Sequence, residues 1–172
     1  MSPVAFAGRV ALCAAIGVLG LGRAPAAAGG SAVLEVTGMT FVGSRGSTGE
    51  LVLRARRALY RPDSSLAELE EVRTVVTDEA EGRSLEMTCN RVELDLETND
   101  FKAEGNVEGV TAGGQRYSAP WVHYQHEPGV IFSEAQVQMV DGGTTLRGDG
   151  FRFHIREHRF HLLGNVSVEQ AP

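Results

Sequence analysis

The chain has only two cysteines among its 172 residues, Cys13 and Cys89. Cys13 falls in an N-terminal apolar segment, so Cys89 is the single cysteine of the remaining chain and no intramolecular disulfide can form there. Leu12 precedes Cys13 and the apolar run follows it, which excludes the pattern of a lipidated cysteine. We expect Cys89 to be a small, buried and unreactive residue.

Basic residues are also few. The sequence has 16 Lys and Arg residues against 22 Asp and Glu residues, a formal charge of −6. Without Arg9 and Arg23, which lie in the N-terminal segment, 14 basic residues face 22 acidic ones, a charge of −8. Such a domain repels phosphate backbones, so nucleic acid is excluded as a partner.

Motifs that carry catalysis or hold metals are missing. The sequence has no nucleophile elbow, no phosphate-binding loop and no metalloprotease helix. The histidines gather at a predicted hairpin tip and after Trp121, without the Cys or paired carboxylates that complete a metal site, and we interpret the three at the hairpin tip as exposed imidazoles. We therefore predict no catalytic residue, no metal site, no cofactor and no enzyme activity. The histidines concerned are His123, His126, His154, His158 and His161.

The first thirty residues resemble a targeting segment. Arg9 supplies a positive start, residues 10–22 are a run of thirteen apolar residues, and Ala24-Pro25-Ala26 or 26–28 offers a cleavage site. Thirteen residues are fewer than the ~20 that span a bilayer core. We interpret residues 1–30 as a signal peptide or a signal anchor, both alternatives staying open, and residues 31–172 as one folded domain.

An apolar signature recurs with a period of about thirty residues, which is typical of repeat architectures. A degenerate earlier copy begins at Leu53, Ala55, Ala58 and Tyr60. The three clear copies are Met87, Cys89, Val92, Leu94 and Phe101; Tyr117, Ala119, Val122, Tyr124 and Ile131; and Leu146, Gly148, Phe151, Phe153 and Phe160.

Alternation with period two covers nearly the whole chain after residue 32 and predicts an all-β domain. Each copy contains a shift of phase: Tyr117 and Ala119 share one parity, whereas Val122 and Tyr124 take the other. A bulge or strand break has this effect, so we expect the chain to bend there. Turn residues between the copies indicate about two strands per unit. The segment 61–71 is expected to be a short helical turn or a loop leading into a strand at 72–77.

The arginines Arg54, Arg56, Arg57 and Arg61 form a basic cluster in an otherwise acidic domain. Charged residues are ordinary on an exposed strand face, and that is our first interpretation. Contact with an anionic head group or partner is the alternative.

The inward face combines bulky positions with small ones at the same height in successive units. Either the facing sheet comes close there, or an apolar ligand fills the stripe. The last predicted strand, residues 160–170, has few of the charged residues that protect a free sheet edge. The inward positions are Phe101, Ala103, Gly105, Val107, Ile131, Phe132, Ala135, Val137, Phe151, Phe153, Phe160, Gly164 and Val166.

The ordered series of these segments resembles the LptC family of lipopolysaccharide-export proteins, and it is similar to the wider group of LptA/OstA-like β-jellyroll domains. The likeness covers residues 33–170 and rests on spacing. It is carried by Leu53-x-Ala55-x-x-Ala58-x-Tyr60, residues 85–94, Phe101-Lys-Ala-Glu-Gly-Asn-Val107, residues 115–124 and 131–137, Leu146-Arg-Gly-Asp-Gly-Phe151 and Leu162-Leu-Gly-Asn-Val166.

This resemblance implies a β-jellyroll of two facing antiparallel sheets in the periplasm, held at the inner membrane by an N-terminal hydrophobic helix. Members of the family receive lipopolysaccharide from the permease subunits of an inner-membrane ABC transporter and pass it to an LptA-like jellyroll by edge-strand pairing. The inward positions then become the lipid groove, and Leu162, Val166 and Val168 become the docking edge.

Three alternatives stay open. The short leader with its cleavage site fits a soluble LptA-like bridge protein. A structural or adhesive exported β-repeat protein has a dry interior in place of a groove. An exported enzyme acting on glycans needs a cleft with paired carboxylates.

Overall fold

The structure is a computed structural model that describes residues 33–45, 49–78 and 83–170. These residues form one open antiparallel sheet of 12 strands, with no helix among them, so the predicted all-β class is confirmed. The predicted N-terminal helix lies outside the described residues. The strands are β1 (Leu34–Arg45), β2 (Gly49–Arg61), β3 (Leu66–Asp78), β4 (Arg83–Asp95), β5 (Phe101–Thr111), β6 (Arg116–Gln125), β7 (Val130–Ser133), β8 (Val137–Asp141), β9 (Thr144–Gly148), β10 (Gly150–His154), β11 (Arg159–Leu163) and β12 (Ser167–Gln170).

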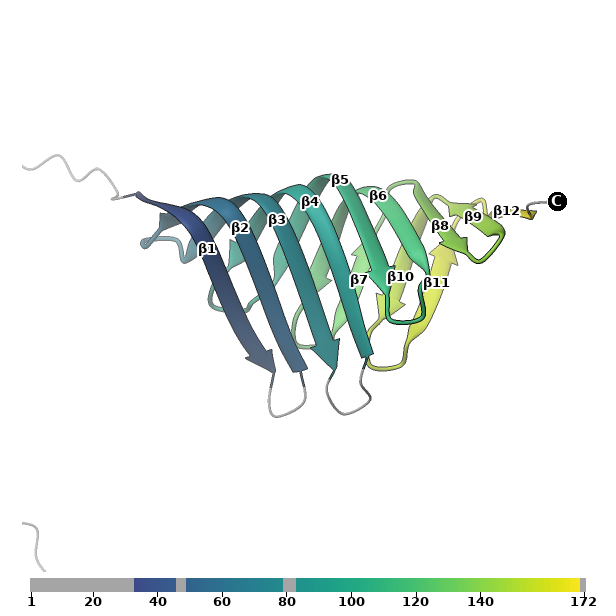
Figure 1. The fold of residues 1–172 in the computed structure, drawn as a ribbon, viewed down its shortest axis with the longest axis horizontal. Helices are drawn as coiled ribbons and strands as arrows, with labels where there is room; N and C mark the ends of the chain where they lie inside the picture. Colours follow the sequence, from purple (N-terminus) through teal and green to yellow (C-terminus); the bar gives the residue numbers. More distant parts are fainter. Residues whose placement is uncertain (1–32, 46–48, 79–82, 171–172) are drawn as a thin grey trace, which may run out of the picture. The chain divides into compact units, whose positions relative to one another are not determined.

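The sheet bends along its length, so that one limb lies in front and the other behind in Figure 1. Strands β1 to β6 cross from one limb to the other, and each later crossing is split into two short strands. The front limb contains β8, β9 and β12 with residues 39–45, 49–55, 72–78, 83–89, 107–111 and 116–119. The rear limb contains β7, β10 and β11 with residues 34–37, 57–61, 66–70, 91–95, 101–104 and 121–125.

The line between the limbs, which we call the crease, interrupts every crossing at the same height. It contains Gly38, Arg56, Glu71, Asn90, Gly105, Asn106, Pro120, residues 134–136, Asp149 and residues 164–166. Several crease residues take the left-handed backbone that ordinary strands avoid, among them Gly38 (φ 72°), Glu71 (φ 52°) and Gly164 (φ 76°).

The crease explains the phase shift that the sequence shows. In β6, Tyr117 and Ala119 are buried before Pro120, and Val122 and Tyr124 are buried after it. An unbroken strand would turn one of these pairs to solvent, since successive side chains alternate between faces. The predicted bend at a fixed place in each unit is confirmed.

The predicted helical turn or loop over 61–71 is wrong. β2 continues to Arg61 and β3 begins at Leu66, so that only residues 62–65 form the turn. Ala67 and Leu69 are buried in this strand, whereas Glu68 faces outward and pairs with Arg61 at 2.6 Å. The many glutamates on the outer face of this strand are the reason why the sequence pattern did not indicate it.

β5 passes the crease with one residue more than its neighbours. Gly105 and Asn106, with φ values of 76° and 50°, lie opposite the single residues Asn90 and Pro120. This extra residue is a β-bulge, which bends the strand and restores its inward parity. A Cβ on Gly105 would lie 2.9 Å from the Asn90 side-chain nitrogen, so glycine is required there for space as well as for φ.

We predict that Gly105→Ala lowers the free energy of unfolding by about 2–3 kcal/mol, because it adds a left-handed alanine and crowds Asn90. Gly38→Ala is the matched control, with φ 72° and no atom within 4 Å of its added Cβ. Gly38→Ala should lower the free energy of unfolding only by the cost of a left-handed alanine backbone, about 1–2 kcal/mol. Urea denaturation of both variants measures the difference, and equal losses would show that the crease is not crowded at Gly105.

Candidate functional site

The inner face of the bent sheet is mostly apolar from one edge to the other. Residues that pair across neighbouring strands form transverse rows, and one such row crosses each limb through all of its strands. The front row is Phe41, Leu53, Thr74, Met87, Gly109, Tyr117, Met139, Leu146 and Val168. The rear row is Leu34, Tyr60, Ala67, Leu94, Phe101, Tyr124, Ile131, Phe153 and Phe160.

The thirty-residue period corresponds to two successive crossings of the sheet. Met87, Tyr117 and Leu146 occupy the same signature position and lie in the front row. Leu94, Phe101 and their equivalents lie in the rear row. The repeat therefore places like residues side by side on the inner face.

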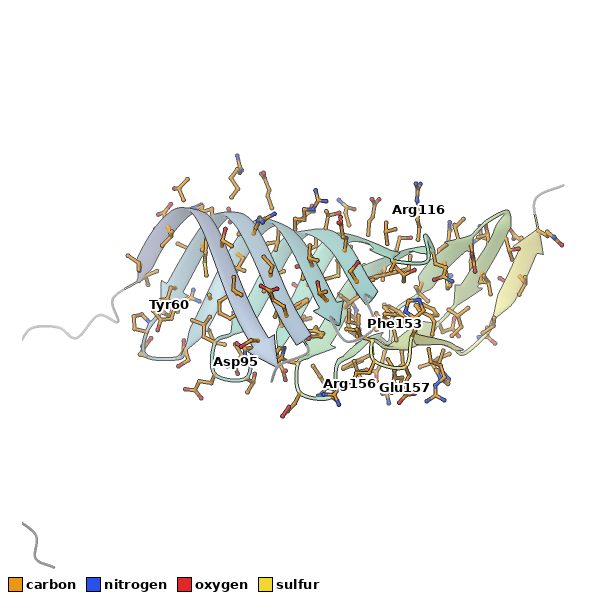
Figure 2. The ribbon with its side chains drawn as sticks, turned by 60° about the horizontal axis from the view of Figure 1, so that its bottom comes forward. Tyr60, Asp95, Arg116, Phe153, Arg156 and Glu157 are labelled. Atoms are coloured by element: carbon orange, nitrogen blue, oxygen red, sulfur yellow. The ribbon has the colours of Figure 1, made fainter. Side chains whose placement is uncertain are left out.

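An aromatic cluster joins the two limbs toward the C-terminal end. Tyr117 of the front limb lies 5.5 Å from Phe151 and 6.5 Å from Phe160 of the rear limb, measured between ring centroids. Phe151 and Phe160 stack at 5.0 Å, and Phe153 lies 6.0 Å from Phe160. In Figure 2, Phe153 lies within the fold, whereas Arg116 extends away from it. A cavity of about 50 Å³ borders this cluster and is also lined by Met139 and His158.

The structure brings most of the predicted inward residues together. Buried on the inner face are Phe101, Ala103, Val107, Ile131, Val137, Phe151 and Phe153, and Phe160 packs against them half-buried. Phe132 is placed differently: it stacks on His123 at 5.4 Å and lies under the Arg152 guanidinium at 5.7 Å. Of the adjacent pair Ile131 and Phe132, only Ile131 faces inward.

The small inward positions Gly105, Ala135 and Gly164 lie at the crease. Beside Gly164, a Cβ would lie 2.6 Å from the Asp149 side chain, whose carboxylate accepts hydrogen bonds from Asn165 N–H (3.1 Å) and Nδ2–H (2.8 Å). Gly105 and Gly164 therefore serve the bend of the strands. The predicted stripe of small residues is occupied by Asn90 and Asp149 at these two points.

Two hydroxyl groups of the front row are buried without a hydrogen-bond partner among the described residues, Thr74 Oγ1 and Tyr117 OH. An unpaired buried hydroxyl costs about 1–3 kcal/mol. Burial raises the pKa of Tyr117, with a smaller contribution from Cys89, so the phenol is neutral at physiological pH. Sequence analysis missed both groups, since nothing in the alternation marks a hydroxyl as unpaired.

Gly109 creates the space for Tyr117. The two residues are cross-strand partners, and a Cβ on Gly109 would lie only 2.0 Å from the Tyr117 ring. The Tyr117 ring therefore occupies the space above Gly109 on β5. A glycine opposite a tyrosine on the inner face is the sequence signal that was available for this arrangement.

Near the N-terminal edge, the end of β1 contacts the rear limb. The Ser44 carbonyl only accepts hydrogen bonds, so His126 Nε2 donates to it at 3.2 Å. The His126 ring is also in contact with Tyr124, whose hydroxyl lies 3.2 Å from Nδ1, and its backbone N–H donates to Asp100 at 2.7 Å. The hydrogen bond to Ser44 joins the two limbs at the β1 end, and the contacts with Tyr124 and Asp100 hold the His126 residue in place for it.

The C-terminal end is open by comparison. All four residues of β12 are exposed, and Val168, although it lies in the inner row, is 62% exposed. Val166 is exposed as well, and Leu162 is half-buried against the core. Of the predicted docking residues, Leu162 therefore lies on β11, Val166 at the crease and Val168 on β12, where the inner face meets solvent.

The charged groups of the outer face are largely engaged with one another. Arg56 pairs with Glu71, and Arg57 pairs with Glu35 at 2.8 Å, an interaction that raises the pKa of Arg57. This arrangement agrees with an ordinary solvated strand face. Among the described residues, no three His, Cys, Asp or Glu side chains lie close enough to hold a metal ion. The ring centroids of His154 and His161 lie 6.0 Å apart, whereas the His158 ring packs on Phe153.

No protein-family model matches the chain, and no curated protein is significantly similar to it. Within the described part of the chain, no helical segment has the length and hydropathy of a membrane span. The predicted signal peptide or anchor, residues 1–30, lies outside the described residues.

Cys89 is buried, as the sequence predicted, and its Sγ–H donates to the Arg91 carbonyl at 3.4 Å. Burial raises the pKa of its thiol from 9.0 to about 11. The folded state therefore holds this proton where the unfolded chain has lost it. Its contribution to stability is present below pH 9 and is lost as the pH rises from 9 toward 11.

We predict that iodoacetamide at pH 8 alkylates Cys89 about 100-fold more slowly in the folded chain than in urea, because a shift of two pKa units makes the thiolate a hundredfold rarer. A Cys13→Ser chain isolates the reaction. Mass spectrometry of timed samples gives the two rates. Equal rates would show that Cys89 is accessible and ionises normally.

Proposed function

We propose that this domain is a non-enzymatic lipopolysaccharide transport component. It takes lipopolysaccharide from an inner-membrane ABC transporter and passes it to a periplasmic bridge. One observation carries the proposal: the two rows of inner-face residues are almost wholly apolar from edge to edge, the rear row beginning at Leu34, 56% exposed, and the front row ending at Val168, 62% exposed. An apolar path of this kind suits a cargo with acyl chains, which is exchanged at the edge where the inner face is already exposed.

The energetics suit acyl chains. Each methylene moved from water into an apolar environment contributes about 0.8 kcal/mol, so a chain of ten methylenes contributes on the order of 8 kcal/mol. The inner positions are filled by their own side chains, several of them fully buried, such as Leu69, Val92 and Ile131. Loading therefore separates the limbs, and it begins at the C-terminal end, where the inner face is already exposed.

The last strand serves as the docking edge in this proposal. Among the described residues, β11 and β12 are paired on one side only, with β10 and β9, so the other side offers free backbone groups to an added strand. The partner is an LptA-like periplasmic jellyroll. Residues 1–30 direct the chain to the periplasm, as an inner-membrane anchor in an LptC-like role or as a cleaved signal in an LptA-like one.

A structural or adhesive β-repeat protein is the second candidate. The near-complete burial of the inner side chains is the observation that favours it, because a dry interior of this kind needs no cargo. A search for lipid on the inner face separates the two candidates.

We predict that p-benzoylphenylalanine at Phe160 forms a photo-crosslink to lipopolysaccharide in producing cells, whereas the same residue at Phe132 does not. Both phenylalanines are half-buried, yet Phe160 belongs to the inner aromatic cluster and Phe132 lies on the outer face against His123. Immunoblots for lipopolysaccharide on the purified chain give the readout.

Circular dichroism of each substituted chain controls for folding. A lipid adduct at neither position in folded chains would exclude transport through the interior and leave the dry repeat protein. An adduct at Phe132 alone would place the lipid on the outer face.

The docking edge is tested separately. We predict that p-benzoylphenylalanine at Val168 crosslinks to a periplasmic β-jellyroll, identified by mass spectrometry, and that Val168→Asp abolishes co-purification of this partner. Because Val168 is exposed, the aspartate should change the free energy of unfolding by no more than about 0.5 kcal/mol. The matched control is Val42→Asp on the opposite edge strand, where Val42 is 57% exposed. Loss of the partner in the Val42 variant alone would assign docking to β1.

A further inference from the structure

The two unpaired hydroxyls of the interior lie in one transverse row. Thr74 pairs with Met87, Met87 pairs with Gly109, and Gly109 pairs with Tyr117. Thr74 is 1% exposed and Tyr117 is 4% exposed, so water does not reach either hydroxyl from the outside. Every other member of this row from Phe41 to Val168 is apolar or glycine.

The Tyr117 hydroxyl points along this row toward Thr74. A Cβ on Gly109 would lie 2.3 Å from the Tyr117 hydroxyl oxygen, so the side chain of β6 reaches across β5. From there to Thr74 on β3 two strand spacings remain, on the order of 10 Å. One small polar group cannot hydrogen-bond to both hydroxyls at once, because each hydrogen bond spans only about 2.7–2.8 Å between oxygens.

A hydrocarbon chain in the interior would leave both hydroxyls unpaired. The acyl linkages of a lipid, by contrast, bring carbonyl oxygens that lose their own water on entering the same apolar space. A buried O–H group can donate a hydrogen bond to a buried carbonyl oxygen, so that neither group is left unpaired.

We propose that Tyr117 and Thr74 donate hydrogen bonds to acyl carbonyl oxygens of the bound lipid and thereby select a multiply acylated lipid over a single fatty acid. This inference rests on the proposed function and identifies the polar contacts within the groove. The separation of the two hydroxyls requires two carbonyls, which a lipid with several ester or amide linkages provides.

The position of Tyr117 also gives an order of binding. It lines the cavity of about 50 Å³ beside Phe153 and Phe160, toward the open C-terminal strands. A lipid that enters past β12 reaches β6, and hence Tyr117, before it reaches β3 and Thr74. Tyr117 is the first donor and Thr74 the second.

The test compares Tyr117→Phe and Thr74→Val with the wild-type full chain, purified in detergent. Each variant removes one hydroxyl and little else. We expect each to bind lipopolysaccharide about 3–10-fold more weakly, the effect of one hydrogen bond, while the melting temperature stays the same or rises, because an unpaired group is removed. Unchanged affinity in both variants overturns the inference.

Tyr124→Phe provides the matched stability control on the same strand. The Tyr124 hydroxyl lies 3.2 Å from His126 Nδ1, so its removal should lower the melting temperature by roughly 3–5 °C. A comparable loss in Tyr117→Phe would show that the Tyr117 hydroxyl is structural and overturns the inference.

A second pair of probes isolates the carbonyl. Diacyl phosphatidylglycerol and its dialkyl ether analogue differ only in their ester carbonyls. Both are tested as competitors of a fluorescent lipopolysaccharide. If the fluorescent lipopolysaccharide does not bind, the two phospholipids are titrated directly onto the protein. The diester should bind more tightly than the ether to the wild-type chain and equally to the double variant Tyr117→Phe, Thr74→Val. If the diester and the ether bind the wild-type chain with equal affinity, or if neither of them binds, the proposed contact with the carbonyl is overturned.

These arms separate the inference from the proposed function. A wild-type chain that does not bind lipopolysaccharide but distinguishes the diester from the ether contradicts the proposed cargo and supports the hydroxyl site. A chain that binds lipopolysaccharide with no effect of either hydroxyl supports the cargo and contradicts the site.

Discussion

The whole domain depends on one constraint, which is that every crossing of the sheet must bend at the same height. A single sheet can bury its own inner face only if its two limbs face each other along a common line. Because side chains alternate, a strand that bent one residue early would turn its apolar set outward in one limb. The strands meet this constraint by different local means, a bulge at Gly105 and Asn106, Pro120 in β6 and a full break at Asp149.

The common bend produces a recurring pattern in the sequence, so the bend and the stacking of the strands were predictable from it. Tyr117 and Ala119 against Val122 and Tyr124 show the bend as a change of parity, and its recurrence every two strands shows the stacking. Adjacent apolar residues such as Ile131 and Phe132 stay ambiguous, since only the paired strands decide which of them faces inward. The pairing of Tyr117 with Gly109 could have been found in the sequence, but the unpaired state of the Tyr117 hydroxyl could not, because the alternation shows which side chains face inward and not which polar groups surround them.

The two ends of the sheet differ in a way that bears on loading. At the N-terminal end, His126 of the rear limb binds the Ser44 carbonyl of β1, so opening there breaks a hydrogen bond. At the other end the last strand is exposed, and the limbs meet through the aromatic cluster around Phe151 and Phe160. Apolar contacts between aromatic side chains can be replaced by contacts with acyl chains, because the hydrophobic effect has no preferred direction. A hydrogen bond cannot be replaced in this way, because it needs a donor and an acceptor in a defined geometry. The asymmetry favours a groove that opens from its C-terminal end.

The unpaired hydroxyls bear on the choice between a carrier and a dry repeat protein. Each costs about 1–3 kcal/mol, a considerable share of the 5–15 kcal/mol that stabilises a typical domain. A scaffold that only had to stay folded would gain by having valine in place of Thr74 and phenylalanine in place of Tyr117, since both fit the same space. Two such groups in one row whose other members are apolar or glycine favour the proposed carrier, whose interior would be occupied part of the time by a ligand with polar groups of its own.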